Sequence, residues 1–409
     1  MISPESCILT LNGGSSSIKF SVYRHVGGKL SLVLSGEMES SGQHPFMLHF
    51  TRTRPWYADD AAPTEDPGHQ ESVSLGSTAT SDPSAALSEW LGRQDFYPAI
   101  TAIGHRIVYG MEHPGPALIS TELLEELTRL VSFDPEHLPA EIRLIEKFKA
   151  LSPDLPQVAC FDTSFHFTMP ELAKLLPVPR RYSEKGIRRY GFHGLSYAFL
   201  LSELERTAGT KKARGRVILA HLGSGASMAA VLDLKPVDTS MGLTPAAGLV
   251  MGTRTGDLDP GLAWYFMAAE QMDAAAFSHL VNHESGLLGV SETSGDMRVL
   301  HQSSTVDFRA AQAIALFCYQ AKKQIGAFAA VLDGVDTLIF SGGIGENDAA
   351  VRALICQGLA FLGIELDSEK NIRNESLISA GKTEVRVIKT NEELMIARSV
   401  SEVLNLALN

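Results

Sequence analysis

The sequence predicts an α/β protein built from two related domains. Residues 8–23 read as an apolar run, a turn of glycine and serine, and a second run of alternating apolar and polar residues, which is typical of a β-hairpin. Residues 217–233 repeat this pattern about half the chain later. Strand and helix patterns follow each hairpin, and 409 residues are enough for two domains with large cores.

Composition narrows the class of protein. Charged residues make up 20% and hydrophobic residues 44%, as in an ordinary soluble enzyme. The formal net charge of -12 argues against a general nucleic-acid binder. The four cysteines form no Cys-x-x-Cys pair, so neither a zinc site nor a disulfide framework is indicated. Without a signal-peptide pattern or an apolar run of membrane-spanning length, we expect a cytoplasmic protein with no membrane partner.

The turn of the first hairpin is a candidate phosphate site. Residues 12–17 read Asn-Gly-Gly-Ser-Ser-Ser, and Lys19 follows closely. Small residues let an anion approach the backbone N–H groups of such a turn. An ordinary glycine-rich β-turn is the alternative, because turn composition alone is a weak signal. The recurrence of the pattern at residues 217–233 favours the phosphate interpretation.

Further elements can be placed along the first half. Residues 58–84 are acidic and rich in Pro, Gly, Ser and Thr, and we interpret them as a mobile surface insertion. Helices are predicted from Ser120 and from Pro139. Residues 157–165 read as a buried strand that ends in polar residues. Because ligands of doubly wound sheets bind at the carboxyl ends of strands, Asp162 is a candidate site residue.

The second half continues with a Pro/Gly-rich segment at 239–260 and a helix at 261–271. A long helix is predicted with Asp307 as its N-cap and Gly334 as its C-cap. A strand, a glycine-rich turn and a helix follow over residues 335–363. A last strand at 384–390 precedes a terminal helix that begins near Asn391.

The glycine-rich turn at residues 341–347 could bind an anion or a nucleotide, because backbone N–H groups and a helix dipole meet at a strand-to-helix turn. A turn needed only for close helix–strand packing is the alternative. It is not a P-loop, and Asp348 stands where Gly-x-Gly-x-x-Gly requires its last glycine. A nucleotide here would therefore be bound by another architecture.

Arg254 lies between Gly252 and Gly256 and close to two aspartates, Asp257 and Asp259. Such a loop can direct a guanidinium toward a phosphate while the carboxylates fix its direction. The alternative is a structural Arg–Asp pair.

Three other parts of the sequence are weaker signals of a functional site by themselves. Arg106 follows a short apolar run, and His193 lies in a basic, aromatic cluster at residues 188–194 that could meet an anion. Glu392 and Glu393 begin the terminal helix, where carboxylates commonly just stabilise the helix dipole.

Taken together, the motifs of this chain resemble the acetate kinase family, which includes propionate and butyrate kinases. They occur in family order from Asn12 to Arg398 and read NGGSSSIKF, GHRIV, FDTSFHFTMP, RRYGFHG, HLGSGAS, MGTRTGDLDP, GGIGEN and TNEELMIAR. The resemblance implies two duplicated ribonuclease H-like domains of the actin-like ATPase superfamily, with ATP in a cleft between them. The domains are expected at 1–163 with 392–409 and at 164–391, and a homodimer is expected.

The resemblance also implies roles for individual residues. Catalytic roles fall to Asp162, Arg106, Arg254 and His193. The acid substrate is expected at Arg106, Val108, Phe192 and Pro245. A Mg²⁺ ion, with Mn²⁺ as an alternative, is expected at Asn12 and Glu392. The nucleotide is expected at Lys19, His221, Leu222, Gly223, Ser224, Gly225, Asp296, Met297, Arg298, Gly343, Ile344, Gly345, Glu346 and Asn347.

The physical chemistry agrees with this family. A carboxylic acid is ionised at pH 7 and needs no general base to become a nucleophile, but it must approach an anionic γ-phosphate. Two arginines, a magnesium ion and a histidine would offset that repulsion. We expect direct in-line transfer from ATP to a short carboxylate, with acetate first and propionate or butyrate as alternatives. A sugar kinase, with Asp162 as base, and an ATP-driven chaperone or filament protein are competing hypotheses.

The chain departs from the family pattern in three segments. Glu136-His137-Leu138-Pro139 stands where the family commonly has Leu-His-Asn-Pro, and Tyr109-Gly110-Met111 stands where His-Gly-Gly is usual. Ser224 replaces an asparagine in the second hairpin turn. These departures leave open which acid is preferred and whether diphosphate replaces ATP.

Overall fold

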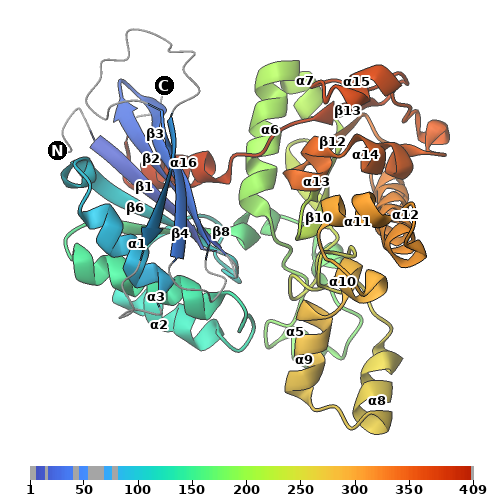
Figure 1. Ribbon diagram of the computed structural model, residues 1–409, viewed down its shortest axis with the longest axis horizontal. Coiled ribbons are helices and arrows are strands. Elements are labelled where there is room, and N and C mark those ends of the chain that lie inside the picture. Colours follow the sequence, from blue (N-terminus) through green and yellow to red (C-terminus); the bar gives the residue numbers. More distant parts are fainter. Residues whose placement is uncertain (1–5, 14–16, 40–45, 54–68, 76–81, 407–409) are drawn as a thin grey trace. The chain divides into compact units, whose positions relative to one another are not determined.

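The computed structural model describes residues 6–13, 17–39, 46–53, 69–75 and 82–406 (Figure 1). It divides into two compact units. Unit 1 comprises Met1–Ser164 and Asn391–Asn409, and unit 2 comprises Phe165–Thr390.

The described part of unit 1 contains an eight-stranded sheet in the order β5-β4-β3-β2-β1-β6-β8-β7. Its strands are β1 (Ser6–Gly13), β2 (Ser17–Val26), β3 (Lys29–Glu39), β4 (Phe46–Arg52), β5 (His69–Leu75), β6 (Ile100–Ile107), β7 (Ala117–Leu118) and β8 (Gln157–Phe161). The predicted first hairpin is confirmed, because β1 and β2 pair antiparallel. Its turn residues 14–16 lie outside the described residues. Strands β1, β6 and β8 run parallel.

Helices cover both faces of this sheet. They are α1 (Pro83–Gly92), α2 (Thr121–Leu130), α3 (Leu138–Leu151) and α16 (Glu392–Val403), with short 3-10 helices at Tyr97–Ala99 and Asp162–His166. Leu9 and Leu11 of β1 join a core that includes Phe148 of α3. Gly104 of β6 faces α16 instead, where Ile396 is buried. Because side chains alternate along a strand, α3 and α16 lie on opposite faces.

The local start signals of these helices are confirmed. The Ser120 side chain accepts a hydrogen bond from Leu123 N and caps α2, and Pro139 lies in the first turn of α3. Asn391 caps α16 in the same way by accepting from Leu394 N.

The packing of α16 on β6 leaves no room for a side chain at position 104. A Cβ on Gly104 would lie 2.4 Å from Ile396 Cγ2 and 2.7 Å from Val400 Cγ2. We expect Gly104→Ala to lower the free energy of unfolding by about 1–3 kcal/mol, because overpacking forces the helix away from the sheet. Chemical denaturation measures this. Gly115→Ala is the matched control, since no atom lies within 4 Å of its added Cβ, and equal stability of the two variants would contradict the prediction.

The prediction that residues 58–84 form a surface insertion is wrong in part. Residues 69–75 form β5, which pairs antiparallel with β4 at the edge of the sheet, and Asp82 is the N-cap of α1. Residues 58–68 and 76–81 lie outside the described residues. The strand was missed because its sequence is polar and flanked by glycine and proline, whereas an edge strand needs only one partner and one buried face.

The described part of unit 2 contains a five-stranded sheet in the order β11-β10-β9-β12-β13. The strands are β9 (Arg216–Leu222), β10 (Ala226–Leu232), β11 (Lys235–Thr239), β12 (Thr337–Ser341) and β13 (Glu384–Val387). The second predicted hairpin is confirmed as β9 and β10, which pair antiparallel. Strands β9, β12 and β13 run parallel, so β9 and β12 end at the same edge.

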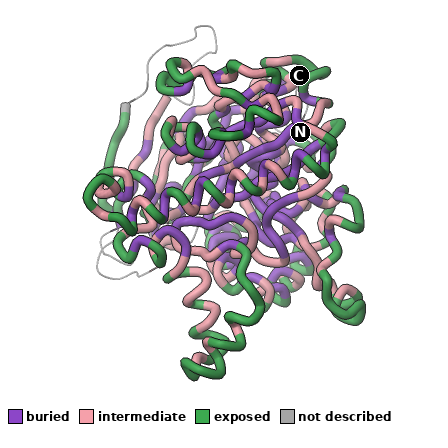
Figure 2. The backbone as a smooth tube through the Cα atoms, turned by 90° about the vertical axis from the view of Figure 1, so that its right-hand side faces the viewer, coloured by how far each residue is buried: buried purple, intermediate pink, exposed green. Residues whose placement is uncertain are grey.

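The helices of unit 2 surround this sheet. They are α4 (Glu171–Lys174), α5 (Arg180–Ser183), α6 (Gly194–Ala208), α7 (Thr210–Ala213), α8 (Pro260–Ala269), α9 (Ala274–His283), α10 (Gly286–Ser291), α11 (Met297–Ser303), α12 (Phe308–Val331), α13 (Gly342–Asn347), α14 (Ala349–Cys356) and α15 (Ser368–Ile372), with a 3-10 helix at Ala360–Leu362. Helices α8 and α9 contain no buried residue and appear green and pink at the bottom of Figure 2. No helix among the described residues is long and apolar enough to cross a bilayer.

Two predictions in unit 2 need correction. Asp307 caps α12 as predicted, but Leu332 and not Gly334 is its C-cap. Asp333 adopts the left-handed conformation, with φ at 56°, and the last residue of the helix, Val331, lies three residues before the glycine. The glycine-rich segment 341–347 is not a turn before a helix, because residues from Gly342 onward already form α13.

Candidate functional site

Polar side chains gather in unit 1 where parallel strands β1, β6 and β8 end. Asn12 lies on β1, Arg106 on β6, and Asp162 directly follows β8. The positions two residues before Asn12, Arg106 and Asp162 lie on the face of the sheet that α16 covers. Because side chains two residues apart in a strand point to the same face, these three polar side chains also lie on the α16 side of the sheet. The N-terminus of α16 brings Glu392 to the same place.

Hydrogen bonds hold the Arg106 guanidinium in one orientation. Its Nε and Nη2 donate to Asp162 Oδ2 at 3.0 and 2.6 Å, and its Nη1 donates to Asn12 Oδ1 at 3.0 Å. Asn12 Nδ2 in turn donates to Glu392 Oε2 at 3.0 Å and to Glu393 Oε1 at 3.3 Å. Because two edges of the planar Arg106 guanidinium already bond to protein side chains, its orientation is fixed before any ligand binds.

The charges of this group are mostly hidden from water. Asp162 is fully buried, and the Arg106 side chain is 15% exposed. Burial works against the charge of Arg106, yet the carboxylates of Asp162 and Glu392 raise its pKa overall. Burial, and then the neighbouring charge of Glu392, raise the pKa of Glu393. Several carboxylates thus crowd around one arginine, which favours binding of a further cation.

The oxygen atoms present fit a magnesium ion better than a transition metal. No cluster of three or more His, Cys, Asp or Glu placed to hold a metal occurs among the described residues. Asn12 and Glu392 offer an amide and a carboxylate side by side. Mg²⁺ commonly takes only one or two protein oxygens and completes its shell with water and phosphate. Lys19 lies cross-strand from Asn12 in the same unit, and its charge acts on Glu393.

A residue missed in the sequence supports this group from the other face of the sheet. Glu141 of α3 is buried, and its two carboxylate oxygens accept from the N–H of Val108 at 3.2 and 3.3 Å. Burial, followed by the charge of Asp134, raises the pKa of Glu141 well above its usual value. Its spacing from Leu138 and Ile145, three and four residues away, was a readable signal for the buried face of a helix.

The raised pKa of Glu141 makes stability depend on pH. In the unfolded chain the carboxyl ionises above about pH 4.5, whereas the folded protein keeps the proton to higher pH, so stability falls as pH rises through this window. We expect Glu141→Gln to raise the free energy of unfolding relative to the natural chain, by up to about 1.4 kcal/mol per pH unit in that window. Denaturation at pH 5 and pH 8 measures this.

Glu146→Gln, at an exposed position of the same helix, is the control. A difference between the natural chain and Glu141→Gln that does not grow with pH would contradict the prediction.

Glu136 and Tyr109, two departures from the family pattern, lie near this region of unit 1. Glu136 is half-buried just before α3, while the neighbouring His137 Nδ1 and Asp134 Oδ1 are 2.8 Å apart. Tyr109 is fully buried and stacks on Phe133. Tyr109 therefore belongs to the packing around the loop after β6.

Two histidines are stacked at the strand ends of unit 2. The rings of His193 and His221 have centroids 4.3 Å apart and planes inclined by 26°. His193 Nδ1 lies 2.8 Å from Ser227 Oγ, and His221 Nδ1 lies 2.8 Å from Ser196 Oγ. These serine contacts, which the sequence did not predict, orient both rings. His193 also has a left-handed backbone, with φ at 60°, a strained conformation that clusters at functional sites.

Arg254 approaches the same histidine across a glycine. A Cβ on Gly225 would lie 3.4 Å from His193 Nε2 and 3.9 Å from Arg254 Nη1. Arg254 Nη1 also donates to the carbonyl oxygen of Pro245 at 3.4 Å. Gly225, His193, Arg254 and Pro245 are therefore neighbours, and a side chain at position 225 would enter the space between the histidine and the arginine.

The aspartates that follow Arg254 serve the backbone. Asp257 Oδ1 accepts from Gly248 N at 2.8 Å, and Asp259 caps α8 by accepting from Gly261 N. The loop itself is tied to α9, since Thr255 N donates to Val281 O at 3.0 Å and Thr253 Oγ1 donates to Asn282 O at 2.8 Å. These bonds hold the arginine loop in place.

Helix α13 begins against the end of β9. Gly342 has φ at 76°, and a Cβ there would lie 2.7 Å from Leu222 O, so only glycine fits. Gly343 faces open space. Glu346 Oε1 accepts from Gly342 N, Ser341 Oγ and Thr390 N at 2.9, 3.2 and 3.1 Å, so this carboxylate stabilises its own helix.

The remaining predicted residues of unit 2 fall into three places. Asp296 caps α11 and pairs with the exposed Arg298 at 2.6 Å, while Met297 is buried between them. Leu222 is buried at the end of β9, whereas Ser224 is exposed. Phe192 is buried just before His193.

The structure thus forms two groups, each within one unit. Unit 1 brings together Asn12, Lys19, Arg106, Asp162 and Glu392, with Val108 two residues after Arg106. Unit 2 brings together His193, His221, Gly225, Pro245 and Arg254. Arginine forks, histidines and a glycine-opened helix start are groups that bind anions and phosphate. Two α/β units with such groups at their strand ends have the anion-binding chemistry that a phosphotransferase needs.

Comparison with known proteins identifies the family. The model of the acetokinase family matches residues 7–398. An acetate kinase of Rhodopseudomonas palustris is 40% identical over 96% of this chain and 97% of that protein. A propionate kinase of Citrobacter rodentium is 40% identical over 97% of this chain and 96% of that protein. The chain belongs to the acetokinase family, whose members are phosphotransferases with a carboxyl group as acceptor.

Comparison with solved structures agrees with this family assignment. A propionate kinase of Francisella tularensis superposes with a TM-score of 0.86 at 35% identity, covering 96% of this chain and 98% of that one. An acetate kinase of Porphyromonas gingivalis gives a TM-score of 0.84 at 34% identity, covering 98% and 100%. The predicted fold class, two duplicated domains of the actin-like ATPase type, is confirmed.

Proposed function

We propose that this protein transfers the γ-phosphoryl group of ATP to acetate, giving ADP and acetyl phosphate. The observation that carries the proposal is the Arg106 guanidinium, which Asp162 and Asn12 hold in one direction at the strand ends of unit 1. A pre-oriented guanidinium pairs well with a carboxylate. We assign residues 1–163 with 392–409 to the acid-binding domain and 164–391 to the nucleotide-binding domain.

For this reaction the protein mainly has to offset the repulsion between the acetate anion and the anionic γ-phosphate. Acetate is already ionised at pH 7 and attacks the γ-phosphorus directly, so no general base is needed. The P–O bond to ADP breaks as the new P–O bond forms, and negative charge spreads over the three equatorial oxygens. Arg106 orients the acid, while Arg254 and His193 face those oxygens. Val108 of unit 1, and Phe192 and Pro245 of unit 2, are assigned to the methyl group of the acid by their motifs.

Asn12 and Glu392 would hold the magnesium ion. Its contribution would be to neutralise charge on the phosphates of the nucleotide. Glu392 Oε2, which accepts from Asn12 Nδ2, would supply a carboxylate oxygen, and Asn12 would supply an amide oxygen. His221, Gly343 and the segment 296–298 are assigned to the nucleotide, together with their neighbours named above.

A hydroxylamine trapping assay tests the function. The protein is incubated with ATP, Mg²⁺, hydroxylamine and acetate, and acetyl hydroxamate is expected, with loss of product when EDTA removes the metal. Parallel reactions contain diphosphate in place of ATP, or no acid. Absence of acyl hydroxamate with acetate, propionate and butyrate alike would refute the proposal.

Propionate is the second candidate acid, because the similar relatives include propionate kinases at the same 40% identity as acetate kinases. The ratio of kcat/KM for acetate and propionate decides between them, since one methylene in an apolar pocket is worth about 1–3 kcal/mol.

We further propose that the protein is a cytoplasmic homodimer that associates through α8. This helix has no charged residue, and Trp264 and Tyr265 are 76% and 52% exposed. An apolar helix exposed on all sides favours a partner. We expect Trp264→Glu to convert a dimer to a monomer in sedimentation experiments, whereas Phe308→Glu, at an exposed residue of α12, should leave the dimer intact. A monomeric natural chain would contradict this proposal.

A further inference from the structure

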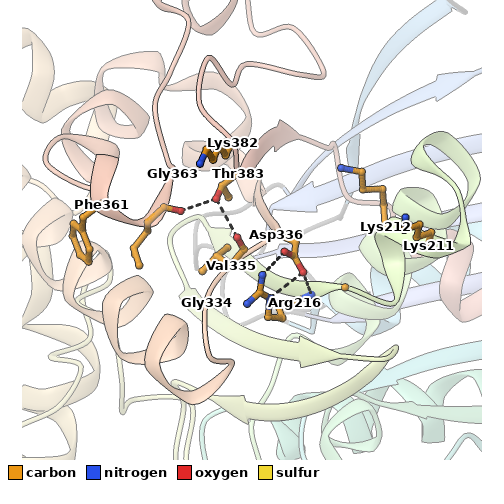
Figure 3. A pocket seen from close by; sticks show the side chains of 12 residues that line it. Lys211, Lys212, Arg216, Gly334, Val335, Asp336, Phe361, Gly363, Lys382 and Thr383 are labelled. Carbon is orange, nitrogen blue, oxygen red and sulfur yellow. Dashed lines mark hydrogen bonds and ion pairs between the residues drawn. The ribbon is translucent and has the colours of Figure 1, made fainter.

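A cavity of about 670 Å³ lies in unit 2 at the starts of three parallel strands (Figure 3). Arg216 begins β9, Asp336 directly precedes β12, and Thr383 directly precedes β13. The groups assigned above to the phosphates lie at the opposite ends of β9 and β12. Because β9 has seven residues and a strand rises about 3.3 Å per residue, about 20 Å separate the two edges.

Basic side chains dominate the wall of this cavity. Lys211, Lys212, Arg216 and Lys382 line it, together with a single carboxylate, that of Asp336. This is an unusual concentration of positive charge in a chain with a formal net charge of -12. A local basic surface on an acidic protein attracts anions selectively.

Ion pairs inside the wall leave part of this positive charge uncompensated. Arg216 donates from Nη2 to Asp336 Oδ1 at 2.6 Å and from Nε to Asp336 Oδ2 at 3.1 Å. These hydrogen bonds lower the pKa of Asp336 and satisfy its two oxygens. Lys212 pairs with Glu384 at 2.5 Å. Within the part of the chain that the structure describes, Lys211 and Lys382 have no ion-pair partner.

The backbone of the cavity wall lies close to the Arg216–Asp336 ion pair at two glycines. A Cβ on Gly215 would lie 3.0 Å from Asp336 Oδ2, and a Cβ on Gly334 would lie 2.5 Å from Arg216 Nη1. Glycine at both positions therefore lets the Arg216–Asp336 pair lie against the backbone and keeps the space open. In Figure 3 this pair lies at the centre, with Phe361 on one side and the two neighbouring lysines on the other.

We propose that this basic cavity binds a small polyvalent anion, bearing phosphoryl or carboxylate groups, at a site separate from the reaction. Lys211 and Lys382 supply the charges that the ligand neutralises, and Asp336 does not repel it because Arg216 already neutralises that carboxylate. The volume lies within the range of small-molecule sites. Phe361, 78% exposed at the edge of the cavity, offers a ring face to any planar part of the ligand.

Calorimetric titration of the full chain with pyrophosphate, and separately with tricarballylate, tests this site. Both titrations are repeated at saturating ATP and Mg²⁺, which occupy the reaction site. We expect one anion to bind per chain in the presence of ATP. The affinity should fall at least ten-fold in Lys211→Ala/Lys382→Ala. Whichever anion binds more tightly identifies the phosphoryl or the carboxylate chemistry.

The control is Lys235→Ala/Lys323→Ala, which removes the same charge from unit 2 outside the cavity and should bind as the natural chain does. No binding of either anion at millimolar concentration would overturn the proposal. Binding that ATP displaces, or that both double variants weaken equally, would overturn it as well. None of these outcomes depends on which acid the protein phosphorylates.

Discussion

Replacing Arg254 by alanine is expected to lower kcat by about 10³-fold, which is the scale of effect seen when an arginine that stabilises transferring phosphoryl charge is removed. Its Nη1 lies in the space beside His193 and Gly225. The negative charge on the equatorial oxygens grows only as the reaction proceeds, so the guanidinium contributes more to the transition state than to bound ATP. We expect the affinity for ATP to change by less than about ten-fold.

Steady-state hydroxamate formation gives kcat, and equilibrium binding of ATP gives the affinity. Arg373→Ala serves as a control, because that arginine is exposed and pairs only with surface carboxylates in the described structure. Unchanged turnover in Arg254→Ala would remove this residue from the mechanism. A loss of ATP affinity as large as the loss of kcat would make it a binding residue instead.

Replacing Asp162 by asparagine is expected to lower kcat by about 10²-fold, because the direction of Arg106 depends on this carboxylate. Two of the guanidinium nitrogens donate to Asp162 Oδ2. The amide oxygen of asparagine can take the place of Oδ2, but the negative charge is lost, so both bonds weaken and the guanidinium is held less firmly. Small misplacements of a substrate-orienting group cost about this much. Loss of a charge-assisted hydrogen bond should also lower the free energy of unfolding by about 2–3 kcal/mol.

The two effects can be separated by assaying well below the unfolding midpoint, where the variant is folded. Asp154→Asn, at an exposed position just before β8, is the matched control. If the folded Asp162→Asn protein has normal kcat and a normal KM for acetate, then the orientation of Arg106 does not depend on Asp162.

Elements with a local signal could be predicted. Both glycine-serine hairpins, the N-caps Ser120 and Asp307, and the start of the terminal helix at Asn391 depend on neighbours within a few residues. Elements that depend on a distant partner were misread. Strand β5 exists because β4 pairs with it. Helix α13 forms from poor helix formers because Leu222 packs against Gly342 and Thr390 N donates to Glu346.

The buried polar partners were the hardest part to predict. Glu141 has the spacing of a buried helix face, but nothing in the sequence identifies its partner, and Ser196 and Ser227 read as ordinary small residues. Only the packing of α3 on β6, and of α6 on the β9–β10 hairpin, shows that they hold Val108, His221 and His193. Each of these residues acts through a contact with a second residue, so its role depends on two positions of the chain and not on its own position alone.

The sequence by itself determined the family and the strand ends at which polar residues gather, because motif order and the period of two are properties of the chain alone. The tertiary structure decided which atoms meet. Asn12 and Glu392 are 380 residues apart, yet their side chains hydrogen-bond. That contact, and the direction it gives to Arg106, depend on sheet register and on where α16 packs. Both are set by the whole core, which no local pattern encodes.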